Sequence, residues 1–239
     1  MSILENSKYS YLIGKQPIFF RFWKKIFYYY CNTVFFFYTP VKVKGKKNLP
    51  SSSAIFCSNH NSHMDVALIS SAVGKSFNHF GMLAAIDYWF DSTVKRVLTN
   101  FVMNLIPVAR QTNQNENSIT FEDTIALCSR FMDYKDRNII IFPEGSRGKP
   151  GKILPFRKGA ARFALALDKP IVPIYIEGSY RAWPRGKVFM KPCKITINIL
   201  EPIYPNDYIS KENPDDLNVK NMTNDLEKII LDERKKYAI

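Results

Sequence analysis

Short apolar runs rich in isoleucine and valine alternate along this chain with longer stretches of helical periodicity. The runs predict strands at 54–57, 79–84, 105–109, 138–142, 170–177 and 194–200. The other stretches predict helices at 64–73, 92–104, 118–134, 157–168 and 216–236. Parallel strands need crossover connections, which are usually helices that cover the sheet. The 239 residues therefore predict an α/β fold with a mixed, largely parallel sheet covered by helices on both faces.

The segment from Asn59 to Asp65 lies where the first strand is expected to turn into the first of those helices. It carries a histidine and a carboxylate five residues apart, His60 and Asp65. Histidine accepts a proton readily at neutral pH, and a carboxylate on its other ring nitrogen fixes the tautomer and stabilises the imidazolium. The pair is therefore a candidate base with its orienting acid. A structural alternative stays open, because Ser62 and Asp65 also have the spacing of a capping box that begins a helix.

A second candidate loop follows the strand at 138–142 and begins with Phe-Pro-Glu-Gly-Ser-Arg at 142–147. Glycine lets backbone amides approach an anion, and an arginine fork with nearby lysines adds a positive field suited to phosphate. Loops after buried strands are also where α/β folds place their ligands. The alternative is an ordinary solvated surface loop. The candidate ligand-binding residues here are Glu144, Gly145, Ser146, Arg147 and Lys158.

Four blocks, in this order, resemble the glycerolipid acyltransferases, the family typified by 1-acyl-glycerol-3-phosphate (lysophosphatidate) acyltransferase. They are an Asn-His-x-x-x-x-Asp block, a short strand ending in arginine, a Phe-Pro-Glu-Gly-Thr-Arg block with a trailing Pro-Phe-Lys-Lys-Gly, and an apolar strand with a central proline. The first and third blocks are specific, whereas the others would be unconvincing alone. Ser146 replaces the usual threonine and keeps its hydroxyl, and Arg157 replaces a lysine. The matching stretches are 59–65, 106–110, 142–147 with 155–159, and 171–178.

This resemblance implies transfer of a fatty acyl group from a coenzyme A or acyl-carrier-protein thioester to the free hydroxyl of lysophosphatidate, which gives phosphatidate. His60 is then expected to deprotonate the acceptor hydroxyl while Asp65 holds the ring. The substrate supplies the nucleophile, so no covalent acyl-enzyme, metal ion or cofactor is expected.

The resemblance also assigns residues to the acceptor. Arg110, Arg147 and Lys158 are expected to grip its phosphate. Glu144 is expected either to accept a hydrogen bond from a glycerol hydroxyl or to anchor Arg147 by a salt bridge. Backbone amides around Gly145, or at the start of the helix after the first block, are candidate donors to the oxyanion.

Charge suggests an anionic partner, since 34 lysines and arginines against 21 acidic residues give a formal charge of +13. The chain has no zinc-finger spacing, helix-turn-helix pattern or RNA-binding aromatic signature, so nucleic acid is not expected. Anionic lipid head groups explain the charge as well. Membrane lipids and the acyl carrier are therefore the expected partners.

Residues 1–40 are expected to form a membrane-associated helical segment in front of an acyltransferase domain at 41–239. Aromatic residues are dense in this segment, but its uncharged run at 26–40 is shorter than the roughly 20 residues that a spanning helix needs. We therefore expect a helix or helix pair lying in one leaflet on the cytoplasmic face, with Trp23, Tyr28 and Tyr30 near head groups and Lys24 and Lys25 in water. A spanning helix and a core helix are the alternatives.

A basic and aromatic segment at 180–187 follows the fourth block. It is expected either to contact head groups or donor phosphates, or to form a solvated hairpin. At the level of function, three alternatives stay open. The acceptor could be glycerol 3-phosphate or another lysophospholipid, the protein could be a silent lipid-binding relative, or His60 could activate water in a hydrolase.

Overall fold

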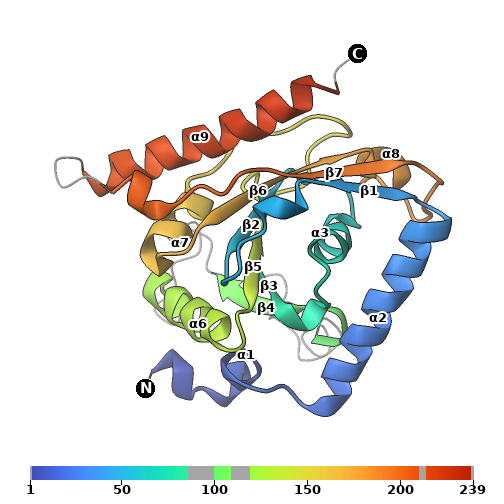
Figure 1. Cartoon of the computed structure of the whole chain (residues 1–239). Coiled ribbons are helices and arrows are strands. Elements are labelled where there is room, and N and C mark those ends of the chain that lie inside the picture. The colour runs from blue at the N-terminus through green and yellow to red at the C-terminus, as the bar shows by residue number, and fades with distance from the viewer. Residues whose placement is uncertain (1, 86–99, 109–118, 210–213, 238–239) are drawn as a thin grey trace.

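A seven-stranded mixed sheet forms the centre of the molecule (Figure 1). The computed structural model describes residues 2–85, 100–108, 119–209 and 214–237. The strands are β1 (Val41–Lys44), β2 (Ile55–Ser58), β3 (Phe80–Ala85), β4 (Asn104–Val108), β5 (Asn138–Ile141), β6 (Ile171–Glu177) and β7 (Ile195–Ile199).

The strands lie in the order β1-β7-β6-β2-β5-β3-β4. Every neighbouring pair is parallel except β6 and β7. In the middle of the sheet, Ile55 lies opposite Ile171 on one side and Ile139 on the other. Strands buried on both faces read as continuous apolar runs, which is why β2 and β5 were recognisable from sequence. The prediction of a mixed, largely parallel sheet is confirmed.

Helices cover both faces of the sheet (Figure 1). On one face lie α6 (Phe121–Asp133), α7 (Gly159–Leu167) and α9 (Asp215–Lys235). On the other lies α3 (Asp65–Val73), with α2 (Ile18–Phe37) packed outside it. The short helices are α1 (Ser10–Ile13) and α8 (Ser179–Ala182), and the 3-10 turns are η1 (Ile3–Glu5), η2 (Ser7–Tyr9), η3 (Lys46–Asn48), η4 (Phe77–His79) and η5 (Pro205–Asp207). Most of the helix expected at 92–104 lies outside the described residues.

Two local predictions differ from the structure. Strand β1 was not predicted, because the four residues Val41–Lys44 alternate between half-buried and exposed and owe their strand conformation to pairing with β7. The segment at 180–187 is not a simple hairpin, since it continues α8 into a turn in which the Lys187 amide donates to the Pro184 carbonyl.

The N-terminal aromatic segment is one helix, α2, which lies along the outside of the molecule (Figure 1). Its inner face buries Lys24, Cys31 and Phe35. The expectation that Lys24 lies in water beside Lys25 was therefore wrong. Successive helical residues are about 100° apart, so Lys24 shares the inner stripe with residues 31 and 35 while Lys25 is exposed.

Hydrogen bonds satisfy the buried Lys24 ammonium. Its Nζ donates to Gln16 Oε1 at 2.6 Å and to Asn104 Oδ1 at 2.7 Å, and Asn104 is itself fixed by donating to the Phe80 carbonyl at 2.8 Å. Burial, with a smaller contribution from Arg137, lowers the pKa of Lys24 from 10.5 to about 7. This polar cluster fastens α2 to the edge strand β4.

The outer face of α2 is apolar and exposed. Within the described parts of the chain, none of the helices combines the length and hydropathy that crossing a bilayer requires. The exposed large side chains on α2 and just after it are Ile18, Phe19, Phe22, Trp23, Ile26, Tyr29, Tyr30, Phe36, Phe37 and Tyr38.

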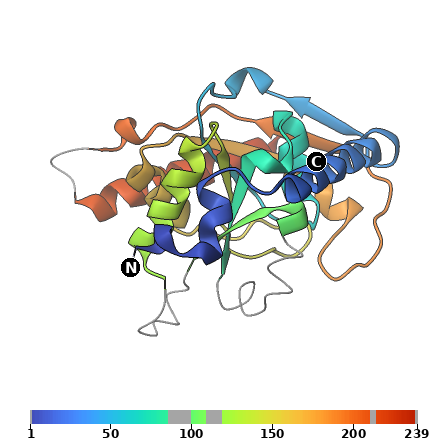
Figure 2. The same ribbon diagram turned by 90° about the horizontal axis from the view of Figure 1, so that it is seen from below.

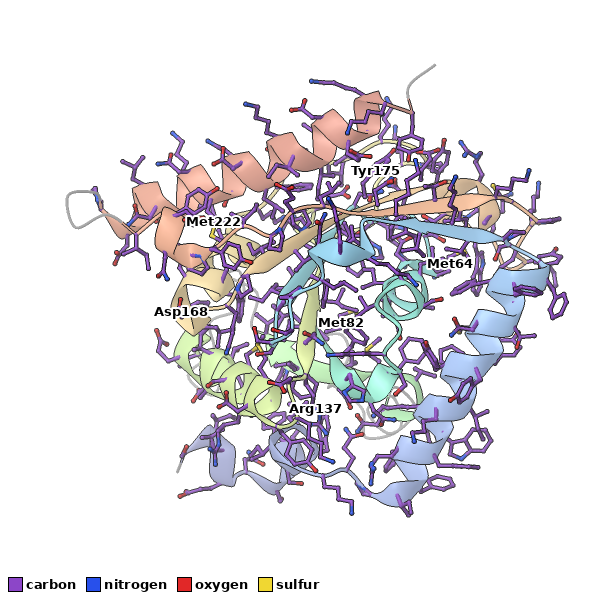
Figure 3. The ribbon with its side chains drawn as sticks, viewed as in Figure 1. Met64, Met82, Arg137, Asp168, Tyr175 and Met222 are labelled. Atoms are coloured by element: carbon purple, nitrogen blue, oxygen red, sulfur yellow. The ribbon has the colours of Figure 1, made fainter. Side chains whose placement is uncertain are left out.

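The first residues of the chain pack into the same hydrophobic core as the sheet, with Tyr9 and Leu12 both buried. Arg137 at the start of β5 (Figure 3) donates to the Gly14 carbonyl at 3.2 Å and stacks on the Tyr134 ring. At the other end of the molecule, Tyr175 of β6 lies beneath α9 (Figure 3). The boundary drawn at residue 40 remains a prediction.

Candidate active site

Three loops meet at one edge of the sheet because β2, β5 and β6 are parallel neighbours. The carboxyl ends of parallel strands lie at the same edge, which is where α/β folds place their sites. The first loop leads from β2 to α3, the second from β5 to α7, and the third follows β6 and α8. The expected meeting of the first and third sequence blocks is therefore present in the structure.

The His60 ring is held by Asp65. Nδ1 of His60 lies 2.9 Å from Oδ2 of Asp65, whose side chain is fully buried. The same oxygen accepts hydrogen bonds from the backbone amides of Asn61 at 2.9 Å and Ser62 at 2.8 Å. A carboxylate in this position accepts the Nδ1 proton and leaves the Nε2 lone pair free to take a proton from a substrate.

The capping-box alternative is only half formed. Met64, not Ser62, is the N-cap of α3, and no side chain caps it. The Ser62 hydroxyl donates instead to the Trp183 carbonyl at 2.7 Å. Asp65 therefore closes the turn in front of the helix and orients His60 with the same oxygen.

The imidazole is further fixed by stacking. The His60 and Phe142 ring centroids are 3.8 Å apart, and the ring planes are 15° from parallel. The His60 side chain keeps 19% of its surface exposed. A hydrogen bond on one ring nitrogen and an aromatic ring against one face thus fix the imidazole, while part of its surface stays accessible to a ligand.

Glu144 joins the two specific blocks. Oε1 accepts the His60 backbone amide at 2.7 Å, and Oε2 accepts the Leu154 amide at 2.7 Å. The residue is only 2% exposed. Burial raises the pKa of Glu144 above its ordinary value, although both amide donors oppose this rise. This clamp on two backbone amides differs from both roles expected from the sequence.

Tight backbone packing shapes the loop after Glu144. Gly145 has a φ of +72°, which favours glycine, and it is exposed together with Ser146. The Gly148 amide donates to the His60 carbonyl at 3.2 Å, and a Cβ at Gly148 would lie 2.8 Å from the Lys152 carbonyl oxygen. Glycine at 148 therefore lets the loop fold closely on itself at Lys152 while it also packs against Asn61 of the His60 turn.

Asn61 completes the link between the two loops. Its Nδ2 donates to the His60 carbonyl at 3.1 Å and to the Lys152 carbonyl at 2.9 Å. On the far side, Arg234 of α9 donates from Nη2 to the Gly151 carbonyl at 2.8 Å. The loop is thus held between the His60 turn and α9.

Arg147 reaches back to the first block. Its Nη1 lies 2.9 Å from Nε2 of His63. Burial, followed by the charge of Arg147, lowers the pKa of His63, which favours the neutral ring that can accept this hydrogen bond. The guanidinium therefore lies beside the His60 turn, with His63 between the two loops.

The structure gives less support to Lys158 and Arg110, the other two residues expected to bind the phosphate. Nζ of Lys158 lies 3.9 Å from Oδ1 of Asp216 on α9, and both side chains are at least half exposed. No contact between Lys158 and the His60 turn is found among the described residues. Arg110 lies outside the described residues.

Sequence reasoning missed several residues that build this site. Asn61 and Phe142 lie inside the recognised blocks, so their positions were available but their contacts were not. Trp183 and Arg234 come from distant segments, and no local pattern marks them. Among the residues that the structure describes, no cluster of three or more histidine, cysteine or acidic side chains is suited to hold a metal ion.

Comparison with known proteins shows which proteins this chain is similar to. The family model described as Acyltransferase matches residues 40–177, more than half of the chain. A 1-acyl-sn-glycerol-3-phosphate acyltransferase from Cocos nucifera is 30% identical over 169 residues, which cover 71% of this chain and 51% of that protein. One from Haemophilus influenzae is 27% identical over 171 residues, covering 70% of this chain and 64% of its own length. The chain spans about half the length of the coconut protein.

The crystal structure of the 1-acyl-sn-glycerophosphate acyltransferase PlsC from Thermotoga maritima has the same fold. It superimposes with a TM-score of 0.64 at 22% identity, covering 89% of this chain and 79% of that one. The family match includes both loops that carry His60, Asp65, Glu144 and Arg147. The chain therefore belongs to the acyltransferase family.

Proposed function

We propose that this protein transfers a fatty acyl group from a coenzyme A or acyl-carrier-protein thioester to the free hydroxyl of lysophosphatidate, giving phosphatidate. The observation that carries the proposal is the His60 to Asp65 pair, with 2.9 Å between Nδ1 and Oδ2 and a His60 side chain that stays 19% exposed. The names of the curated relatives supply the acceptor class.

In the proposed reaction, Nε2 of His60 takes the proton of the acceptor hydroxyl as its oxygen attacks the thioester carbonyl. The carbon–oxygen bond forms, and the tetrahedral intermediate then expels the thiolate as the carbon–sulfur bond breaks. The His60 imidazolium returns its proton to the thiolate. Asp65 stabilises the imidazolium between these steps, so acyl transfer needs no acylated side chain.

For the acceptor, we assign the phosphate to Arg147, whose guanidinium lies beside the His60 turn. Gly145 and Ser146 are exposed in the same loop and can donate backbone or hydroxyl hydrogens to the phosphate or the oxyanion. Arg110 and Lys158 are retained as proposed electrostatic partners of the acceptor. Glu144 acts by holding the turn rather than by touching lipid.

The apolar outer face of α2 supports membrane association. Trp23 and Tyr30 are among its exposed aromatic side chains, and Lys25 is an exposed cation on the same helix. Such faces lie in the interface between head groups and acyl chains. We propose that α2 lies in one leaflet of the membrane on its cytoplasmic face, where a lipid acceptor would be reached without leaving the bilayer.

The test is acyl transfer by the purified protein in liposomes. Palmitoyl and oleoyl thioesters of both carriers are offered with lysophosphatidate, glycerol 3-phosphate or lysophosphatidylethanolamine. His60→Gln is compared with His79→Gln, a histidine in η4 at the opposite edge of the sheet. We expect phosphatidate formation to fall at least about 10²-fold in His60→Gln and to change less than about threefold in the control.

Other outcomes would contradict the proposal. No transfer to any acceptor by folded protein that binds liposomes would indicate a lipid-binding relative without activity. Release of free fatty acid at the same rate with and without acceptor would indicate a hydrolase. Faster acylation of another acceptor than of lysophosphatidate would contradict the proposed substrate but not the proposed role of His60.

A further inference from the structure

The loop at 183–190, which follows α8, displays apolar side chains to solvent. Val188 is 78% exposed and Phe189 is 83% exposed, the largest exposed fraction of any large apolar side chain among the described residues. Figure 2 shows this loop in orange, projecting from the body of the molecule. Leaving two such side chains in water is unfavourable, so this loop tip is a candidate contact surface.

The loop is held in shape by its own contacts. The Trp183 indole Nε1 donates to the Lys187 carbonyl at 2.7 Å, and the Lys191 amide donates to the Ala182 carbonyl at 2.8 Å. Gly186 has a φ of +83°, which allows the turn at the tip. The exposure of Phe189 is therefore a feature of an ordered turn.

Exposed cationic residues flank the apolar tip in the sequence. Arg185, Lys187 and Lys191 are exposed, and none of the three is in an ion pair within the described parts of the chain. Exposed cations that flank a protruding apolar tip in the sequence match a bilayer surface, where phosphates lie above the acyl chains. A protein partner would have to match the same pattern with an acidic rim around an apolar pocket.

The loop contacts the segment that directly follows α2. The Tyr38 hydroxyl, just after α2, donates to the Met190 carbonyl at 3.1 Å. Phe36 and Phe37 at this end of α2 are 75% and 77% exposed. Figure 1 shows the loop beside the same end of the helix. This hydrogen bond thus places the loop next to the exposed end of α2, although the two segments are about 150 residues apart in the sequence.

The base of the loop contacts the catalytic turn directly. Ser62 donates to the Trp183 carbonyl at 2.7 Å, and the Trp183 and His63 rings are 5.3 Å apart. A surface that fixes the loop therefore also fixes the turn that carries His60. This geometry links the position of the tip to the position of the site.

We propose that the loop at 183–190 is a second membrane anchor, which inserts Val188 and Phe189 between anionic lipids and so sets the catalytic turn at the bilayer surface. This inference rests on the proposed lipid acceptor for its purpose, but membrane binding by the loop can be measured without any acyl donor. It adds to α2 a contact that lies outside the segment matched by the family model.

The test is cosedimentation with vesicles of phosphatidylcholine alone or mixed with phosphatidylglycerol. The double variant Val188→Ser/Phe189→Ser is expected to bind about tenfold more weakly to both vesicles. The triple variant Arg185→Gln/Lys187→Gln/Lys191→Gln is expected to lose about fivefold per cation on the anionic vesicles only. The matched control is Tyr204→Ser, an exposed aromatic residue near the opposite edge of the sheet, which should bind like the unaltered protein.

Thermal unfolding of each variant shows whether its fold is kept, and both loop variants should melt within a few degrees of the unaltered chain. Equal vesicle binding by the double variant and the unaltered protein would overturn the proposal and point to a protein partner for the tip. A Tyr204→Ser variant that binds as weakly as the double variant would overturn it as well, because the loss would then not be specific to the loop. Vesicle binding by a protein that transfers no acyl group would contradict the proposed function and leave the anchor intact.

Discussion

Replacing Asp65 by asparagine separates orientation of His60 from stabilisation of its charge. Oδ2 of Asp65 accepts hydrogen bonds from His60 Nδ1 and from the amides of Asn61 and Ser62, at 2.9, 2.9 and 2.8 Å. An amide oxygen in the same place can accept all three, so the turn and the ring tautomer are kept. The variant loses only the negative charge beside the ring.

The distances give the size of the effect. A pair with 2.9 Å between its nearest atoms has charge centres roughly 4 Å apart, and unit charges at this separation attract by about 4 kcal/mol at an effective dielectric constant of about 20. If the proton is about half transferred in the transition state, about 2 kcal/mol is lost. This corresponds to a decrease in kcat of about 30-fold.

The substitution also has a cost in stability. Oδ1 of Asp65 is buried and has no hydrogen-bond partner among the described residues. The asparagine NH2 would be unpartnered as Oδ1 is now, but the three hydrogen bonds to the other oxygen would no longer be charge-assisted, which costs about 1–3 kcal/mol. The unfolding midpoint should therefore fall by several degrees while the enzyme remains folded at the assay temperature.

The assay measures phosphatidate formation at saturating acyl donor for the unaltered protein, Asp65→Asn and Asp65→Ala. We expect kcat to fall about 30-fold in Asp65→Asn with KM for lysophosphatidate changed less than about twofold, since the pair acts in the transition state. Asp65→Ala should lose more, because the turn loses its acceptor too. An Asp65→Asn protein that melts early but keeps the original kcat would show that Asp65 only closes the turn.

Three further perturbations test neighbouring contacts. Glu144→Gln keeps an acceptor for one of two amides and should lower kcat about tenfold without raising KM, measured in the same assay. Arg234→Met removes the donor to the second loop and should lower both kcat and the melting midpoint, whereas Lys228→Met, exposed on the same helix, should change neither. The pKa of His63 is lowered, so its neutral ring accepts from Arg147 at pH 7, and this contact is lost as protonation sets in at acid pH. KM for lysophosphatidate should therefore rise between pH 7 and about pH 5, and this rise should be flatter in His63→Gln, which does not titrate.

Sequence was sufficient where structure follows from local pattern. The isoleucine run at 139–141 identified a central strand, because a strand buried on both faces has no polar alternation. The positions of His60 and Glu144 after parallel neighbours then implied that their loops share an edge. Both features follow from the order of apolar runs along the chain, without knowledge of any side-chain contact.

Sequence was insufficient where a side chain acts across the fold. Lys24 and Lys25 look alike as neighbours in a basic pair, and only packing of α2 decides which one is buried. Glu144 was expected to meet substrate or Arg147, but two orphan amides from separate segments reach its carboxylate first. Arg234 contacts Gly151 across 83 residues, a separation over which composition and periodicity carry no information.

The two buried carboxylates at the site explain why the geometry favours proton transfer to His60. Asp65 holds the ring, Glu144 holds the backbone amide of the same residue, and each also accepts further amides that make its burial tolerable. While His60 is neutral, these charges attract only dipoles. In the proposed mechanism, a cation forms on His60 beside Asp65 when the ring takes the acceptor proton, so the attraction between the two would be strongest in the transition state, where it would accelerate the reaction.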